Sequence, residues 1–247
     1  QKPEWNGQPL DGKTIVLWGE QGIGDEIRFA SLVPEMMNRG ANILIECDPR
    51  LVALYERSFA TAEIVAREDD LSVPFEVKCD YQVALIDLAG HFRPAIESFP
   101  SGRYSYLTAD PERVEFWRQR LAELGPCPKI GILWRSILTS DERMPFYASV
   151  QEMAPILKLQ GVDFINLMYA ECSEDRARIN EMYGVNVHTW DDIDLKDDQD
   201  DLAALISSVD LVVGPMTATG NLAGALDIPV FVFFTAKRAV ELLGNPD

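Results

Sequence analysis

The chain has 247 residues, enough for one large domain or two domains of ordinary size. Hydrophobic residues make up 47% and charged residues 25%, the balance of a globular protein with a substantial core. The formal net charge of −18 argues against a nucleic-acid groove, because phosphate binding along a groove needs a clustered basic surface. It still permits a small anionic ligand held by a few arginines.

Targeting and metal-binding signals are weak. No apolar run approaches the ~20 residues that span a bilayer, and the polar N-terminus lacks the apolar core of a secretion signal. The four cysteines are scattered without a CxxC pair, which favours free thiols in a reducing compartment. With only two histidines, a histidine-based metal site has almost no material. We therefore expect a cytoplasmic protein with no membrane span, no metal and no other cofactor.

In chain order, apolar runs alternate with helical patterns. Before residue 125, strands are predicted over 14–18, 43–47, 63–66 and 82–88, with helices after Asp25, over 49–59 and over 111–124. A Gly-Pro-Cys-Pro joint at 125–128 interrupts the pattern. Beyond it, strands are predicted over 129–134, 162–168, 185–188, 211–214 and 230–234, and helices over 149–159, 173–183, 200–208 and 217–226.

This alternation predicts right-handed βαβ units and parallel sheets. We expect an α/β protein of two Rossmann-like, doubly wound domains, 1–125 and 129–247, facing each other across a cleft. In such folds the ligand lies at the carboxyl ends of the strands, so the loops that follow the strands are the places to search for function.

The loop after the first strand is the most informative. It holds Gly19, Gly22 and Gly24, and Asp25 then opens a helical segment. Strand, glycine loop and helix form a geometry in which backbone N–H groups face a ligand. Asp25 is therefore a candidate for chemistry. The alternative is that it only N-caps the helix, as Asp often does.

The loop after the strand at 211–214 leads into a helix of small residues. Its first N–H groups are suited to an anion such as a pyrophosphate, with Thr217, Ala218 and Asn221 at the helix start. The alternative is that the small residues only permit close packing of this helix. Tyr169 follows another strand and is a candidate to stack on a nucleobase or sugar.

Three motifs resemble one family along essentially the whole chain: Trp5-x-Gly-x-Pro-Leu-x-Gly-Lys13, Trp18-Gly-Glu-Gln-Gly-Ile-Gly-Asp25 and Leu222-Ala-Gly-Ala-Leu-x-x-Pro229. They closely resemble the glycosyltransferase-like module that follows tetratricopeptide repeats in many bacterial proteins. That module is similar to the heptosyltransferases, which are inverting GT-B enzymes. The resemblance implies a nucleotide-sugar donor bound mainly by the second domain and a glycan or protein acceptor presented by the first.

The resemblance also implies roles for particular residues. Asp25 takes the place of the catalytic base, and Gly22, Ile23 and Gly24 form the acceptor-side loop. The stretch after the strand at 129–134 supplies hydroxyl and basic groups to the donor phosphates, and the candidates there are Arg135, Ser136 and Arg143.

The sequence departs from this family at several points. The family often has Asp-Thr-x-x-x-His in the late loop, whereas this chain has Met216 and Asn221 at the two outer positions. The chain stops at Asp247, where the family usually continues through a tryptophan-rich tail, and no repeat region precedes it. We therefore expect an excised module whose natural partners include an upstream tetratricopeptide region. A catalytically silent domain that binds a nucleotide, glycan or protein is the alternative function.

Two weaker patterns favour other readings. Gly22-x-Gly24 followed by Glu46 and Asp48 is also typical of dinucleotide binding, but Ile27 stands where the third glycine belongs. Residues 191–201 hold seven aspartates, including an Asp192-Ile-Asp194 triplet. We interpret this run as a solvated loop leading into a helix N-terminus rather than as a metal motif.

Overall fold

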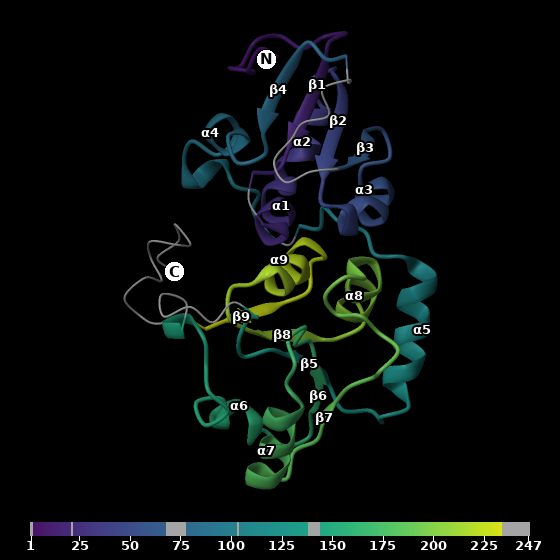
Figure 1. Ribbon diagram of the computed structural model, residues 1–247, viewed down its shortest axis with the longest axis vertical. Coiled ribbons are helices and arrows are strands. Elements are labelled where there is room, and N and C mark those ends of the chain that lie inside the picture. The colour runs from purple at the N-terminus through teal and green to yellow at the C-terminus, as the bar shows by residue number, and fades with distance from the viewer. Residues whose placement is uncertain (1, 21, 68–77, 103, 138–143, 234–247) are drawn as a thin grey trace. The chain divides into compact units, whose positions relative to one another are not determined.

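The computed structural model describes residues 2–20, 22–67, 78–102, 104–137 and 144–233. The chain divides into two compact units, Gln1–Thr108 and Ala109–Asp247, and each contains one sheet (Figure 1). Every ladder between the described strands is parallel, which confirms the predicted α/β class with parallel sheets. Among the described helices, none has both the length and the apolar character needed to cross a membrane.

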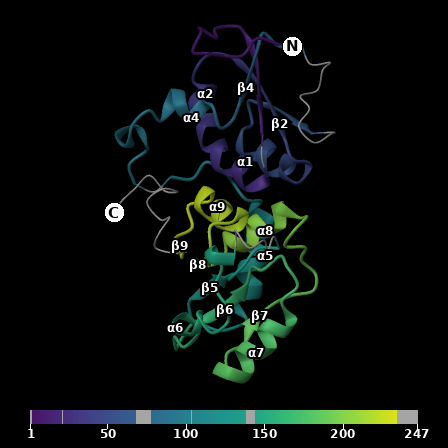
Figure 2. The same ribbon diagram turned by 60° about the vertical axis from the view of Figure 1, so that its left-hand side comes forward.

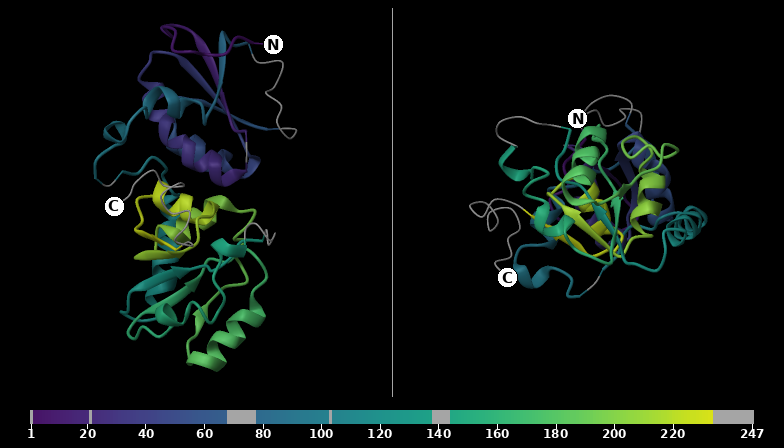
Figure 3. Two further views of the ribbon diagram at one scale, coloured as in Figure 1. Left: turned by 90° about the vertical axis from the view of Figure 1, so that its left-hand side faces the viewer. Right: turned by 90° about the horizontal axis from the view of Figure 1, so that it is seen from below.

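The sheet of the first unit has the order β3-β2-β1-β4. Its strands are β1 (Thr14–Trp18), β2 (Asn42–Cys47), β3 (Glu63–Ala66) and β4 (Tyr81–Ala84). The two central strands are apolar runs because helices cover both faces of a parallel sheet. The helices are α1 (Ile23–Phe29), α2 (Val33–Met37), α3 (Val52–Ser58) and α4 (Leu88–Phe92). A short 3-10 turn joins α1 to α2, so the two run on almost continuously beside the strands (Figure 3).

The sheet of the second unit has the order β7-β6-β5-β8-β9. Its strands are β5 (Lys129–Ile132), β6 (Asp163–Asn166), β7 (Val187–His188), β8 (Leu211–Gly214) and β9 (Val230–Val232). The helices are α5 (Pro111–Ala122), α6 (Ala154–Leu157), α7 (Ser173–Tyr183), α8 (Gln199–Ile206) and α9 (Ala218–Ala225). Helix α8 contacts α5 and α9, whereas α6 contacts α7, so the helices form two groups (Figure 2).

The predicted joint at 125–128 lies between α5 and β5, inside the second unit. Helix α5 packs against α8 of that unit. Trp117 on α5 is buried and donates its indole N–H to Asp201 of α8 at 2.9 Å. The sequence signal at Gly-Pro-Cys-Pro therefore marks the end of a helix, while the division into compact units falls at Thr108.

Several predicted elements are shorter in the structure, and two of them have a local cause. The strand predicted over 82–88 ends at Ala84, and a turn leads directly into α4. The apolar run continues through both elements, so its periodicity does not separate them. The helix predicted over 149–159 is α-helical only at Ala154–Leu157. Upstream of it, the Glu152 carboxylate accepts hydrogen bonds from the Ser149 N–H and hydroxyl, which closes a turn.

Gly214 is the last residue of β8 and packs against Leu133, which directly follows β5. A Cβ at this position would lie 2.4 Å from Leu133 Cδ2 and 2.9 Å from the Leu133 carbonyl oxygen. We expect Gly214→Ala to lower the free energy of unfolding by roughly 1–3 kcal/mol, the usual cost of overpacking a core. Gly224→Ala on the exposed face of α9 is the control. A Cβ there meets nothing within 4 Å, so we expect it to stabilise by about 0.5–1 kcal/mol. Urea unfolding of both variants tests the pair.

Candidate functional site

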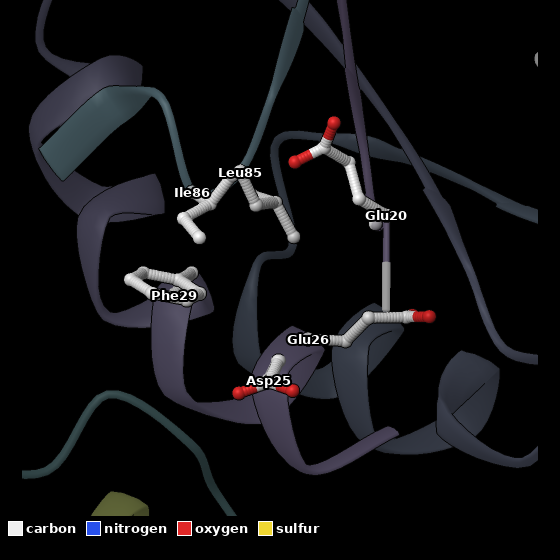
Figure 4. A pocket seen from close by; sticks show the side chains of 7 residues that line it. Glu20, Asp25, Glu26, Phe29, Leu85 and Ile86 are labelled. Atoms are coloured by element: carbon white, nitrogen blue, oxygen red, sulfur yellow. The ribbon is translucent and has the colours of Figure 1, made fainter. Parts of the chain in front are cut away.

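The strand order of the first unit reverses between β1 and β4, the point at which ligands of doubly wound folds bind. A cavity of about 10 Å³ lies there, lined by residues from the ends of both strands and from α1: Gly19, Glu20, Asp25, Glu26, Phe29, Leu85 and Ile86 (Figure 4). This volume corresponds to roughly one water molecule. The cavity is therefore comparable in size with a single hydroxyl group.

Asp25 lies in the first turn of α1 and does not cap it. The N-cap is Gly22, whose backbone is extended, and α1 has no side-chain cap hydrogen bond. The interpretation of Asp25 as an N-cap is therefore wrong, because α1 begins at Ile23, three residues earlier than a cap at Asp25 requires. The half-buried Asp25 carboxylate makes no hydrogen bond to the described residues. In Figure 4 it lies on the same side of α1 as Phe29, one turn further on, while Glu26 extends away from them.

The remaining residues of the predicted acceptor-side loop adjoin this carboxylate. Gly22 is exposed, whereas Ile23 and Gly24 are half-buried and already belong to the first turn of α1. The loop proper is therefore short. It lies between Gly19 and Gly22, and Gln21 within it is outside the described residues.

Three charged residues that were not assigned to the site from the sequence, Glu26, Glu46 and Arg67, form a cluster next to this loop. Glu26 and Glu46 are almost fully buried, and the Arg67 guanidinium forms ion pairs with both. This arrangement overturns the dinucleotide interpretation, because Glu46 is inaccessible to a ribose. Asp48 is engaged as well, since its carboxylate binds the Arg50 side chain at 2.8 Å.

On the second sheet the strand order reverses between β5 and β8, and several predicted donor residues lie there. The buried Ser136 hydroxyl forms a hydrogen bond with the Tyr169 hydroxyl, so the structure brings together two residues 33 positions apart. Arg135 donates to the Glu171 carbonyl at 2.7 Å and to the Asp175 carboxylate at 3.1 Å. Its guanidinium is therefore partly engaged by the protein. Arg143 lies outside the described residues.

The start of α9 holds the other predicted donor residues. Thr217 is the N-cap, and its hydroxyl oxygen accepts the Gly220 N–H at 3.5 Å. Ala218 is the first helical residue, and Asn221 follows one turn later. The Thr217 side chain thus bonds one of the N–H groups that were expected to bind an anion. Fewer N–H groups in the first turn of α9 therefore remain for a ligand than the sequence predicted.

A larger pocket of about 640 Å³ opens at the carboxyl ends of β6 and β7. Pockets of roughly 300–1,000 Å³ are the usual size for small-molecule ligands. Tyr169 is the predicted site residue that lines it, and the sequence analysis missed Asn166, Arg176, Thr189 and Trp190. Arg176 lines the pocket, and its Nε is buried without a hydrogen-bond partner among the described residues. These residues could have been found from their positions, because each lies at the end of a parallel strand, in the loop after it, or in the first turn of the helix that follows.

The acidic run borders this pocket and behaves as a structural loop. Asp194 accepts the N–H groups of Lys196 and Asp197, and Asp198 caps α8. Asp192 binds Arg120 of α5 through both carboxylate oxygens, at 2.7 and 2.9 Å. Within the described ranges, no cluster of three or more His, Cys, Asp or Glu side chains is arranged to hold a metal ion.

Comparisons with known proteins place this geometry in context. No family model matches the sequence. Protein FlbA from Caulobacter vibrioides is 37% identical over 254 residues, which cover 96% of this chain and 42% of that protein. The chain therefore spans less than half the length of this relative.

Solved structures are similar to the chain over most of its length. A glycosyl transferase family 9 protein from Veillonella parvula has a TM-score of 0.67 at 13% identity, covering 91% of this chain and 82% of its own. E. coli ADP-heptose LPS heptosyltransferase II has a TM-score of 0.62 at 15% identity, covering 90% and 84%. The fold of this chain is therefore similar to that of these glycosyltransferases. Its structural neighbours are heptosyltransferase-like glycosyltransferases, which agrees with the resemblance read from the sequence motifs.

Proposed function

We propose that this chain is a glycosyltransferase module that transfers a sugar from a nucleotide-sugar to a hydroxyl of a glycan or protein acceptor, with inversion and without a metal ion. The observation that carries the proposal is Asp25. Asp25 is half-buried and is one of the residues around a small cavity at the switch point of the first sheet, and its carboxylate neither caps α1 nor bonds a described residue.

Asp25 serves as the general base of this reaction. In inverting transfer the base removes the proton from the acceptor hydroxyl as that oxygen attacks the anomeric carbon. The anomeric centre gains oxocarbenium character while the nucleoside diphosphate departs. A cavity comparable in size with one hydroxyl group, beside a carboxylate, suits this step, because the base must lie within hydrogen-bond reach of the proton that it removes.

The donor binds to the second domain. We propose that the pocket at the ends of β6 and β7 takes the nucleoside part, with Tyr169 on its wall and Arg176 offering a positive charge. We propose that Ser136, Arg143 and the residues at the start of α9, Thr217, Ala218 and Asn221, bind the diphosphate, with Arg135 assisting. Donors of this kind stabilise a leaving diphosphate without a metal ion.

The domain organisation completes the proposal. We propose that the chain has the two Rossmann-like domains of a GT-B fold, and the family 9 neighbours support this proposal. An upstream tetratricopeptide region would then supply or select the acceptor.

A silent binding domain is the second candidate. It is favoured by Met216 and Asn221, which stand where the family often has an acid and a histidine. Such a domain would keep the fold and bind a nucleotide, a glycan or a partner protein without transferring a sugar.

A donor screen separates the two candidates. The full natural protein is incubated with a panel of nucleotide-sugars, and thermal shift reports binding while release of nucleoside diphosphate with a matching mass gain on an acceptor reports transfer. The enzymatic proposal predicts both signals for one donor. Binding without any transfer or hydrolysis supports the silent domain, and no binding at all contradicts both.

The Arg143→Ala variant tests the donor side. A guanidinium that binds the diphosphate contributes a charge-assisted hydrogen bond, so we expect its loss to weaken nucleotide binding by about 1.5–3 kcal/mol. Calorimetry on the folded variant measures this change. Arg178→Ala is the control, because this exposed arginine on α7 lies outside the proposed donor residues. An affinity equal to that of the unsubstituted protein would move the diphosphate site elsewhere.

A further inference from the structure

A buried charge cluster lies at the carboxyl ends of β1, β2 and β3. Glu46 belongs to β2, Arg67 directly follows β3, and Glu26 comes from α1. Glu26 and Glu46 are 2% and 1% exposed, and the Arg67 side chain is 9% exposed. Charged side chains are rarely buried to this degree unless they are paired, so the cluster needs an explanation.

One guanidinium serves two carboxylates in this cluster. Arg67 Nη2 binds Glu26 Oε1, and Arg67 Nε lies 3.6 Å from Glu46 Oε1. Arg67 Nη1 donates to the Gly19 carbonyl oxygen at 3.3 Å. The second Glu26 oxygen accepts the Asp48 N–H at 2.8 Å, which ties the cluster to the end of β2.

These contacts hold both ends of the segment that carries Asp25. At its start, the Gly19 carbonyl is bonded to Arg67, and the backbone packs so tightly on Glu26 that a Cβ at Gly19 would lie 2.4 Å from Glu26 Cγ. At its other end, Glu26 directly follows Asp25 on α1. Because consecutive side chains of a helix point in directions about 100° apart, the anchored Glu26 sets the rotation of α1 and with it the direction of Asp25.

Stability gives little reason for such a cluster. Well-packed apolar side chains often replace a buried ionic cluster without loss of stability. Here Glu46 Oε2 and Arg67 Nε also lack hydrogen-bond partners among the described residues, so the cluster is not optimised for stability. The charged side chains instead fix the orientation of the groups that they bind, because a guanidinium holds its N–H donors in one rigid plane.

We propose that Arg67 is a positioning residue for Asp25: by holding Glu26 and the Gly19 carbonyl, its guanidinium fixes the position of the Asp25 carboxylate beside the small cavity. The effect on catalysis rests on the sugar transfer proposed above. The expected effect on the order of the segment from Gly19 to Phe29 is independent of that function.

The test compares two conservative variants of the full natural protein. Arg67→Lys keeps the charge but loses the planar fork. Arg93→Lys is the matched control, since Arg93 is an equally buried arginine of the same unit that is ion-paired with Glu35 and lies outside the cavity lining. Amide hydrogen exchange is followed in peptides covering residues 19–29 and in peptides from β4, and kcat and KM for the donor are measured.

We expect Arg67→Lys to speed exchange in residues 19–29 by about tenfold or more while β4 keeps its protection, and Arg93→Lys to leave residues 19–29 unchanged. We expect kcat to fall by about 100-fold, as for a base misplaced by about 1 Å, with the donor KM unchanged. If the lysine variant does not fold, Glu26→Gln replaces it, since the amide oxygen can still accept the Asp48 N–H.

Unchanged exchange in residues 19–29 of a folded variant would overturn the positioning role, and so would an unchanged kcat in an active protein. If the unsubstituted protein transfers no sugar, the proposed function fails, and the exchange comparison alone decides whether Arg67 holds the segment.

Discussion

Replacing Asp25 with asparagine is expected to slow sugar transfer by roughly two to four orders of magnitude, the usual contribution of a general base. Asparagine has nearly the same shape but cannot accept the proton. Because the Asp25 side chain does not cap α1, we expect the free energy of unfolding to change by less than about 1 kcal/mol. Nucleotide binding should persist, because the donor is proposed to bind the other domain.

The matched control is Asp110→Asn, which changes an acid at the start of α5 that is not among the residues lining the cavity. Asp110 is an N-cap that accepts two backbone N–H groups, and asparagine caps about as well. Its transfer rate should stay near that of the unsubstituted protein. An Asp25→Asn variant that keeps the full rate would exclude Asp25 as the base. A protein that binds a nucleotide-sugar but never transfers it would favour the silent domain.

The wild-type protein is expected to lose stability as the pH rises from 4.5 to about 8, and the Glu46→Gln substitution should prevent most of this loss. Burial raises the pKa of Glu46 from 4.5 to about 7, with Glu26 raising it further and Arg67 opposing. Between pH 4.5 and 7 the unfolded chain releases this proton while the folded chain retains it, so the free energy of unfolding falls as pH rises. The shift corresponds to about 3 kcal/mol, lost by about pH 8.

Urea unfolding at pH 5 and pH 8.5 measures this effect. The glutamine variant should lose much less stability between the two values. A smaller loss of the same sign should remain, because burial also raises the pKa of Glu26. Glu152→Gln is the control, since hydrogen bonds from the Ser149 N–H and hydroxyl lower the pKa of that exposed acid, and its titration lies below pH 4.5. Equal losses in the variant and the unsubstituted protein would contradict a proton on Glu46.

Local sequence patterns determined the fold class and most of its elements. The strands at Thr14–Trp18, Glu63–Ala66 and Leu211–Gly214 and the helix at Ser173–Tyr183 have the predicted bounds. Each is set by contacts within a few residues: a short apolar run that ends at polar or glycine residues, or a helical pattern that ends at Gly184 in the left-handed conformation. The four cysteines are free, as their scattered spacing indicated.

Tertiary structure decided which distant side chains meet. Arg67 binds Glu26 across 41 positions, and Ser136 meets Tyr169 across 33. Asp192, in a run predicted to be a solvated loop, is bound by Arg120 of α5. No local period encodes such pairs, because they form only when parallel strands align their carboxyl ends and helices pack on one another.

The site residues illustrate the same division. A glycine loop after a strand was enough to single out Asp25, since strand, loop and helix are local features. Whether that carboxylate caps its helix or lies beside a cavity depended on where α1 begins and how it is rotated. Burial of Glu26 beneath Gly19 sets that rotation, and burial is decided by packing between elements rather than by the order of residues within one.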